Sequence, residues 1–426
     1  MLIDSLSIDA TTSRSHPSEL RRRVQGLAAL LLGTFAAALA IFARMTRAGV
    51  NSDILIHAAI ARADWAEGRW FTYSAWYPLL YAASAGERLI DLRTASILLL
   101  AGATSAKVVL SRRAARAWGA TSGWASLIAL ATFFATPLLA VGQDTINGFV
   151  YTSRVHGAIY LGQFSATLWH NSTSIASLPL VLAAALSARR MIDTPRLGTV
   201  VWTSAWLTLS ALMKPNYALI ALPVLTPVLL WISARTTNRR TMLGYLAVIS
   251  LPVSAVLALQ LVLVHLDPNV VQVALTWDPL RLWRHYSRWP ILSTFLSVAF
   301  PLAATVAVRV RRREWDRWLL TCWTVLAIGI LQVACLGERN RMTGLRTYDG
   351  NWFWGPHAAV LVLFVACGAA LARPTHPDPN DGPSQRRASR TRTTLTVFAW
   401  VLFAMHVLTG MLYVWRLFHY TNGFET

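Results

Sequence analysis

Apolar residues along the chain fall into eleven long runs separated by shorter polar stretches. Most runs have about 18–24 residues, the length that an α-helix needs to cross a hydrocarbon core of roughly 30 Å. The pattern predicts an all-α, polytopic integral membrane protein with about eleven transmembrane helices, at residues 25–44, 90–111, 121–141, 172–189, 197–213, 216–234, 242–265, 290–309, 317–336, 354–373 and 394–416.

Composition supports this fold class. The chain has 426 residues, of which 55% are hydrophobic and 14% are charged. A soluble domain carries about 25% charged residues. Most of the surface is therefore expected to face the lipid bilayer.

Positive charge is concentrated in alternate loops. In a soluble protein, a net charge of +20 would indicate nucleic-acid binding. In a membrane protein, the positive-inside rule explains such an excess, because loops on the cytoplasmic side are rich in Lys and Arg. We therefore expect no nucleic-acid partner. The apolar runs predict a multi-pass protein of the inner (plasma) membrane of the cell, and the rule predicts a cytoplasmic N-terminus, an extracytoplasmic C-terminus and polar chemistry facing outside. The basic loops lie at residues 21–23, 112–116, 189–190, 235–240, 309–313 and 373–392.

The polar stretches divide the chain into four expected parts. Residues 1–20 are Ser/Thr-rich and predict a disordered cytoplasmic tail, and residues 21–373 are expected to form the transmembrane core, which would hold any catalytic residues. Residues 374–392 are basic and Pro-rich, as in a solvated cytoplasmic linker, and residues 393–426 form the final transmembrane helix with a short outer tail. Cys322, Cys335 and Cys367 lack metal-ligand spacing and are expected to be buried.

The first polar outer segment contains a candidate catalytic pair. Asn51-Ser52-Asp53 resembles the start of a helix, and His57 follows Asp53 by four residues. Side chains four residues apart share one helix face, so Asp53 and His57 are candidates for a general base with its partner, or for two ligands of a divalent metal ion. The alternative is that Asp53 only stabilises the helix N-terminus.

The second outer segment is rich in hydrogen-bonding side chains and leads directly into an apolar run. Gln163, Trp169, His170 and Asn171 supply the amide, indole and imidazole groups that a sugar-binding site needs. The alternative for part of this segment is structural, because Asn171 or Ser172 is a suitable N-cap for the next helix.

Cations at the outer boundary are candidate phosphate ligands. Lys214 is one of only two lysines, with Lys107, and no topological signal requires a lysine there. Arg339, Arg341 and Arg346 lie in another outer loop, and arginine binds phosphate oxygens bidentately. The alternatives are that Lys214 snorkels to the interface and that the arginines contact anionic lipids non-specifically.

With these residues in place, the chain resembles the GT-C class of membrane glycosyltransferases, and looks like its uncharacterised bacterial members. This class uses polyprenyl-phosphate-linked sugars at the outer face of the membrane. The topological resemblance covers most of the chain, whereas the motifs cover a few dozen residues. The motifs are Asn51-Ser52-Asp53 with His57, the stretch at 163–173, and Lys214-Pro215-Asn216.

The resemblance implies a function and roles for the residues. The first-loop carboxylate of the class is a catalytic base or metal ligand, and Asp53 stands at that position. Class members often have a second acidic residue directly after this carboxylate, but here Ile54 follows Asp53. Whether Asp53 and His57 bind a divalent metal ion is therefore an open question. The implied reaction is inverting transfer of a sugar from a polyprenyl-phosphate donor to a glycan or lipid-linked acceptor, with Lys214 and the loop arginines neutralising the departing phosphate.

Other functions fit parts of the pattern. A transporter or flippase of a lipid-linked or anionic solute explains the helices and cations, but it predicts charged residues near mid-membrane. Asp91 and Arg93 are the main charges in the apolar runs. A glycan ligase or polymerase shares the topology but centres on one large loop, and a non-catalytic scaffold leaves the polar segment at 163–173 without a purpose.

Overall fold

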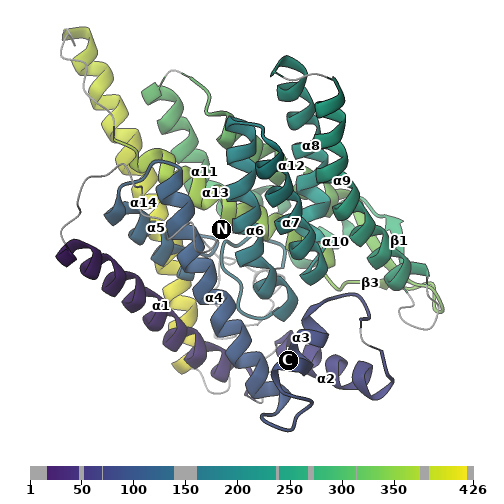
Figure 1. Cartoon of the computed structure of the whole chain (residues 1–426). Helices are drawn as coiled ribbons and strands as arrows, with labels where there is room; N and C mark the ends of the chain where they lie inside the picture. Colours follow the sequence, from purple (N-terminus) through teal and green to yellow (C-terminus); the bar gives the residue numbers. More distant parts are fainter. Residues whose placement is uncertain are drawn as a thin grey trace.

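Long apolar runs that contain few breaking residues form helices, and these helices dominate the architecture. The computed structural model describes residues 17–47, 52–69, 71–138, 161–236, 239–266, 273–312, 314–374 and 383–419. The long helices of this part lie side by side in a bundle (Figure 1). They are α1 (Pro17–Met45), α4 (Leu92–Ala117), α6 (Ser172–Asp193), α8 (Asn216–Thr236), α9 (Arg239–Leu261), α11 (Pro290–Arg312), α12 (Arg317–Cys335), α13 (Trp354–Ala372) and α14 (Pro383–His419).

Nine helices of the described part are long and apolar enough to cross a membrane. Two further apolar helices, α5 (Ser122–Phe134) and α7 (Leu197–Met213), are shorter. The chain is therefore mostly helical and has the make-up of a polytopic membrane protein. The expected number of about eleven spans is reached only if both shorter helices are counted, and the orientation in the membrane stays a prediction.

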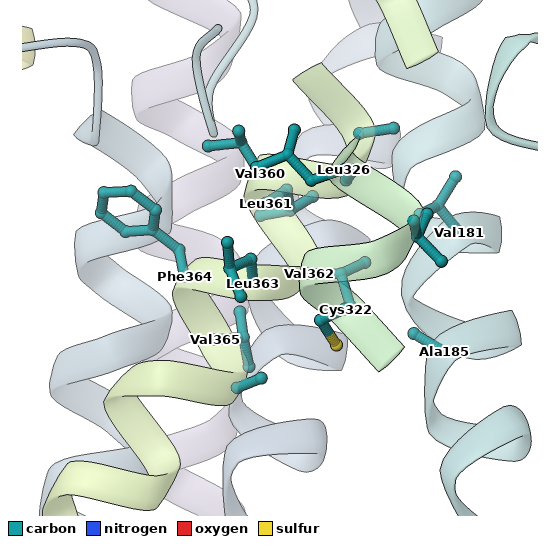
Figure 2. Packing of buried hydrophobic residues seen from close by; sticks show 14 of the residues in the cluster. Val181, Ala185, Cys322, Leu326, Val360, Leu361, Val362, Leu363, Phe364 and Val365 are labelled. Carbon is teal, nitrogen blue, oxygen red and sulfur yellow. The ribbon is translucent and has the colours of Figure 1, made fainter. Parts of the chain in front are cut away.

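Helix α13 forms the centre of the bundle. Of its most apolar 18-residue window, 94% is buried inside the protein. Figure 2 shows its valines and leucines at 360–365 packed against Val181 and Ala185 of α6 and against Cys322 and Leu326 of α12. These side chains meet protein instead of lipid, and α13 is the element on which α4, α5, α6, α8, α11 and α12 pack.

Helix α5 is shorter than the sequence predicts. The run at 121–141 was expected to be one transmembrane helix, but α5 ends at Phe134, and 13 residues span only about 20 Å. Pro137 accounts for the end, because proline lacks an amide hydrogen and disfavours helical backbone in the residue before it. The non-helical chain after Phe134 bonds to other helices: the Thr136 amide donates to the His406 carbonyl (3.2 Å), and the Leu138 amide donates to the Leu296 carbonyl (3.3 Å).

Short elements gather at one end of the bundle, which we call the site end. There α2 (Asp53–Ala66) and α3 (Trp76–Ala83) lie below α6 and α7 in Figure 1. A three-stranded antiparallel sheet of order β1-β2-β3 departs from the all-α expectation. Its elements and near neighbours are the π-helix η2 (Val262–Leu266), β1 (Val273–Trp277), α10 (Arg281–Tyr286), β2 (Leu336–Asn340), β3 (Arg346–Thr347) and the 3-10 helix η3 (Asn351–Phe353).

Arginine-rich helix ends meet at the opposite end of the bundle, which we call the arginine end. The Arg373 guanidinium donates to the Trp118 carbonyl (2.7 Å), and that of Arg311 donates to the Leu371 carbonyl (3.0 Å). The helix ends beside the basic loops at 112–116, 309–313 and 373–392 therefore lie together in the fold.

Two expected boundaries differ from the structure. Helix α14 begins at Pro383, inside the range 374–392 expected to be a linker, and α1 begins at Pro17, inside the range 1–20 expected to be a disordered tail. Residues 1–16, 375–382 and 420–426 lie outside the described residues, so the predictions for them stay predictions.

Candidate functional site

The start of α2 is fixed to the segment that precedes α6. Ser52 is the N-cap of α2, and its Oγ accepts a hydrogen bond from the Ile54 amide (3.4 Å). The Asp53 amide and the Ser52 hydroxyl both donate to the His170 carbonyl, at 3.1 and 3.4 Å. The first and second polar segments of the sequence therefore meet at the site end.

Asn171 joins the two members of the predicted catalytic pair. Its Oδ1 caps α6 by accepting from the Ser174 amide (3.0 Å). This bond fixes which side of the amide group is oxygen. The Nδ2 consequently faces α2, donating to Asp53 Oδ2 at 2.9 Å and lying 3.4 Å from His57 Nε2.

The orientation of Asn171 argues against a metal ion bridging Asp53 and His57. A metal ligand must present a free lone pair, and here an amide N–H group points at both His57 Nε2 and Asp53 Oδ2. In the described part of the chain, no group of three or more His, Cys, Asp or Glu side chains is arranged to bind a metal. The residues present therefore fit a hydrogen-bonded carboxylate better than a metal centre.

His57 is buried and neutral. Burial and the positive charge of Lys214 lower the pKa of His57 to about 4, against the opposing effect of Asp53. Its Nδ1 lies 3.1 Å from the Tyr77 hydroxyl, which in turn donates to the Tyr73 hydroxyl. Since Nε2 faces an amide donor, the proton of the neutral ring is assigned to Nδ1, where it is donated to Tyr77.

The sequence pattern predicted no role in the site for Tyr73 or Tyr77. Both lie in an aromatic stretch that is typical of a membrane interface. Burial raises the pKa of each phenol, so both stay protonated. They make His57 a fixed neighbour of Asp53 and hold its ring in one orientation.

Lys214 caps the end of α7 and is partly buried at the site. Burial lowers the pKa of Lys214 to about 8, and the carboxylates of Asp53 and Glu338 oppose this shift. Its Nζ lies 5.8 Å from the centre of the Trp354 ring. Within the described residues, the amine donates to no hydrogen-bond acceptor and forms no ion pair, so a largely charged donor is available to an anionic ligand.

Glu338 supplies a second carboxylate near Lys214, and the sequence did not single it out. It is buried in β2 and accepts hydrogen bonds from the Asn351 amide at 3.1 and 3.4 Å. Asn216 Nδ2 donates to the Asn351 carbonyl (2.7 Å). These contacts fix the turn between α7 and α8, and with it the position of Lys214.

The segment at 161–171 has a largely structural role. Gln163 and Trp169 are both buried, and the Trp169 ring packs against Phe42 and Phe133 with centroids 5.7 and 5.0 Å apart. Trp169 therefore presents no open face to a sugar, contrary to the prediction. The reason is that this non-helical chain runs inside the bundle, where its own groups must be satisfied by protein.

His357 illustrates how that segment is satisfied. Its Nδ1 accepts a hydrogen bond from the Ser165 amide at 2.7 Å, and it lies on α13, within an apolar run that gave no functional signal. His170 is also buried, with its ring centroid 5.2 Å from that of Trp354. Burial lowers the pKa of His170, so it adds a neutral ring next to Trp354, the ring that Lys214 also approaches.

The three loop arginines do not form a single clamp. Arg346 Nε pairs with Asp278 Oδ2 at 2.9 Å. Arg339 follows buried Glu338 directly in β2 and is exposed. Arg341 in the following turn is exposed as well. Successive strand residues point to opposite faces of a sheet, so Arg339 points away from the carboxylate that neighbours Lys214.

The described site therefore combines a half-buried carboxylate, a neutral histidine and an available lysine at the end of an apolar bundle. Comparison with protein-family models finds no matching model, and comparisons with curated proteins and with solved structures find no match. The fold defines the class, a mostly helical protein with many apolar membrane-spanning candidates. The function of the site is therefore inferred from the positions and charges of its own residues.

Proposed function

We propose that the protein is a membrane glycosyltransferase that transfers a sugar from a polyprenyl-phosphate donor to an extracytoplasmic glycan or lipid-linked acceptor. The observation that carries the proposal is that Asp53 lies close enough to Lys214 for its negative charge to oppose the lowering of the Lys214 pKa. A carboxylate that accepts a proton and a cation that binds a phosphate are the two groups that this reaction needs.

Asp53 is the general base in this proposal. Its Oδ2 is held by Asn171, whereas its Oδ1 accepts no hydrogen bond from the described residues. The Asp53 carboxylate removes the proton of the acceptor hydroxyl while the hydroxyl oxygen forms a bond to the anomeric carbon. The bond from that carbon to the phosphate oxygen breaks, and its electron pair leaves with the polyprenyl phosphate, which inverts the anomeric configuration.

Lys214 stabilises the departing phosphate. Negative charge develops on the phosphate oxygen as the bond breaks, and a fixed cation in a partly buried site stabilises that charge more than it would in water. The polyprenyl chain is insoluble in water, which suits a site at the end of an apolar bundle.

Asp53→Asn tests the base directly. In cells that lack the gene, a plasmid encoding the wild-type protein should restore the missing envelope glycan, and the Asp53→Asn variant should not. Mass spectrometry of envelope glycans measures the difference. Because Asn also accepts hydrogen bonds and suits a helix start, the variant is expected to reach wild-type levels in the membrane.

Asp91→Asn is the matched control. Asp91 caps α4 through the Thr94 amide (2.7 Å), and asparagine caps equally well, so this variant should restore the glycan fully. Full restoration by Asp53→Asn would overturn the proposed base, and equal loss in both variants would point to a general effect of removing carboxylates.

Transport is the second candidate function, and Lys107 is the observation that favours it. This buried lysine lies within α4, ten residues before its end at Ala117, or about 15 Å along the helix. Buried charges at such depth often mark a transport path. Its Nζ, however, donates to the Thr132 carbonyl at 2.7 Å and lies 3.5 Å from the Thr167 hydroxyl. Both partners are neutral, and the contacts join α4 to the last turn of α5 and to the non-helical segment at Thr167. This lysine therefore has a structural role that explains its burial, and we favour the enzyme.

A further inference from the structure

A groove lies between α1, α4 and α5, far from the candidate site along these helices. Its volume is about 560 Å³, and its lining includes Gly26 and Leu30 of α1, Arg112 of α4, and Ser122, Ser126 and Leu130 of α5. Figure 1 shows α1 diverging from the other helices toward its N-terminal end. The groove is therefore the space that this divergence leaves.

One wall of the groove is polar. Arg112 Nε donates to the Ser126 hydroxyl at 2.9 Å, and its Nη2 donates to the Ser122 hydroxyl at 3.3 Å. Among the described residues Arg112 has no carboxylate partner that would neutralise its positive charge. The guanidinium is held in place by hydroxyl groups and keeps further N–H groups for another acceptor.

The polar and apolar lining residues are ordered along the helices. Arg112 lies five residues before the end of α4 at Ala117, and Ser122 is the first residue of α5. Leu130 lies two turns further along α5, on the same face as Ser122 and Ser126 because they are four residues apart. The polar groups thus lie at the arginine end, and the groove becomes apolar toward the middle of the bundle.

We propose that this groove binds an anionic phospholipid of the leaflet at the arginine end. The phosphate binds Arg112 and the Ser122 hydroxyl, and the first part of an acyl chain lies along Leu30 and Leu130. The order of charge, hydroxyl and apolar groups in the groove matches the order of phosphate, glycerol and acyl chain in a phospholipid. Arg112, which has no carboxylate partner among the described residues, selects an anionic headgroup over a zwitterionic one.

Native mass spectrometry of the full chain with phosphatidylglycerol or phosphatidylcholine tests the proposal. We expect one phosphatidylglycerol to be retained in preference to phosphatidylcholine. Arg112→Gln should weaken this retention about tenfold, as the loss of a charge-assisted hydrogen bond predicts. Arg113→Gln is the matched control, because Arg113 neighbours Arg112 on α4 but does not line the groove, and it should retain the lipid within about twofold.

A second variant tests the groove without removing its charge. Leu130→Trp should fill the apolar part and also weaken retention of phosphatidylglycerol. Inorganic phosphate at millimolar concentration should not displace the lipid, and displacement would show that the site binds a free anion. Equal losses in Arg112→Gln and Arg113→Gln, or unchanged retention in both Arg112→Gln and Leu130→Trp, would overturn the proposal.

Discussion

Two ionisable side chains, Lys214 and His57, set the charge of the candidate site at neutral pH. The pKa of Lys214 is lowered to about 8, so its amine is mostly protonated at pH 7. The pKa of His57 is lowered to about 4, so its ring is uncharged there. Across the neutral range, the site therefore offers one cation and a neutral ring beside the carboxylate of Asp53.

The pKa of Lys214 predicts how phosphate binding depends on pH. The amine must be protonated to attract a phosphate, and its protonated fraction falls as the pH rises through about 8. Affinity for polyprenyl phosphate should fall by about twofold from pH 7 to 8. Well above pH 8 it should fall by about tenfold per pH unit, as for loss of a single required proton. Binding of polyprenyl phosphate to purified protein in nanodiscs measures this dependence.

Two variants separate charge from structure in this experiment. Lys214→Arg should bind without the decline above pH 8, because a guanidinium stays protonated throughout this range. Lys214→Met should bind weakly at every pH. A decline that persists in Lys214→Arg would assign the titration to another group, and unchanged binding by Lys214→Met would mean that the lysine does not contact the phosphate.

Part of the candidate site could be predicted from the sequence. Local spacing places Asp53 and His57 on one helix face, and Asn171 stands where a helix cap is expected. Spacing does not reveal that Tyr77 contacts His57 or that Glu338 approaches Lys214, because those contacts depend on how distant elements pack. The prediction that Trp169 contacts a sugar failed for the same reason, since composition alone does not distinguish an exposed indole from a buried one.

At the scale of elements, a close backbone contact joins α14 to the end of α5. Gly410 on α14 lies against the Phe134 carbonyl, with no space for a Cβ atom. Beside it, the Thr409 hydroxyl donates to the Leu138 carbonyl at 3.0 Å. Helix α14 thus packs on the non-helical chain that follows α5.

Replacing Gly410 with alanine should therefore destabilise the protein. The added methyl group meets backbone atoms, which cannot rotate away, and overpacking of this kind costs about 1–3 kcal/mol. The change should appear as a lower midpoint of thermal unfolding in detergent.

Gly244→Ala is the control for this prediction. Gly244 lies on α9 with no atom within 4 Å of an added Cβ, and alanine favours a helix over glycine by about 0.5–1 kcal/mol. Its midpoint should stay the same or rise. A Gly410→Ala protein as stable as the wild type would show that α14 and α5 can separate without cost.

Most helices could be predicted from apolar runs because length and hydrophobicity are local properties. The run at 197–213 coincides with α7. The prediction failed at Pro137, where an apolar stretch contains a residue that ends a helix, and hydropathy alone gives this residue no special weight. It also failed to find the sheet, because β1 and β2 pair across a long sequence separation.

At the scale of the whole molecule, charge and chemistry lie at opposite ends. The arginine-rich helix ends meet at one end, through contacts such as Arg373 with the Trp118 carbonyl, and the candidate site lies at the other. The positive-inside rule then predicts that the site end faces the outside of the cell.

Cysteine labelling of intact cells tests this orientation. Leu345 is 69% exposed at the site end, whereas Arg116 is exposed at the arginine end. A membrane-impermeant maleimide should label Leu345→Cys in intact cells and should label Arg116→Cys only after permeabilisation. The wild-type protein gives the background from Cys335, which is partly buried. The reverse pattern would place the site in the cytoplasm and contradict an extracytoplasmic reaction.

The broken end of α5 has a consequence for biosynthesis. The Thr136 amide donates to the carbonyl of His406, and the His406 ring lies 2.6 Å from the Thr136 carbonyl. His406 is synthesised 270 residues after Thr136, so these peptide groups have no such partner while the intervening chain is made and inserted. Peptide groups without hydrogen-bond partners are costly in hydrocarbon, so the bundle is completed only when its last helix is inserted. A nascent chain that ends before α14 would leave these peptide groups of the α5 end without their partners.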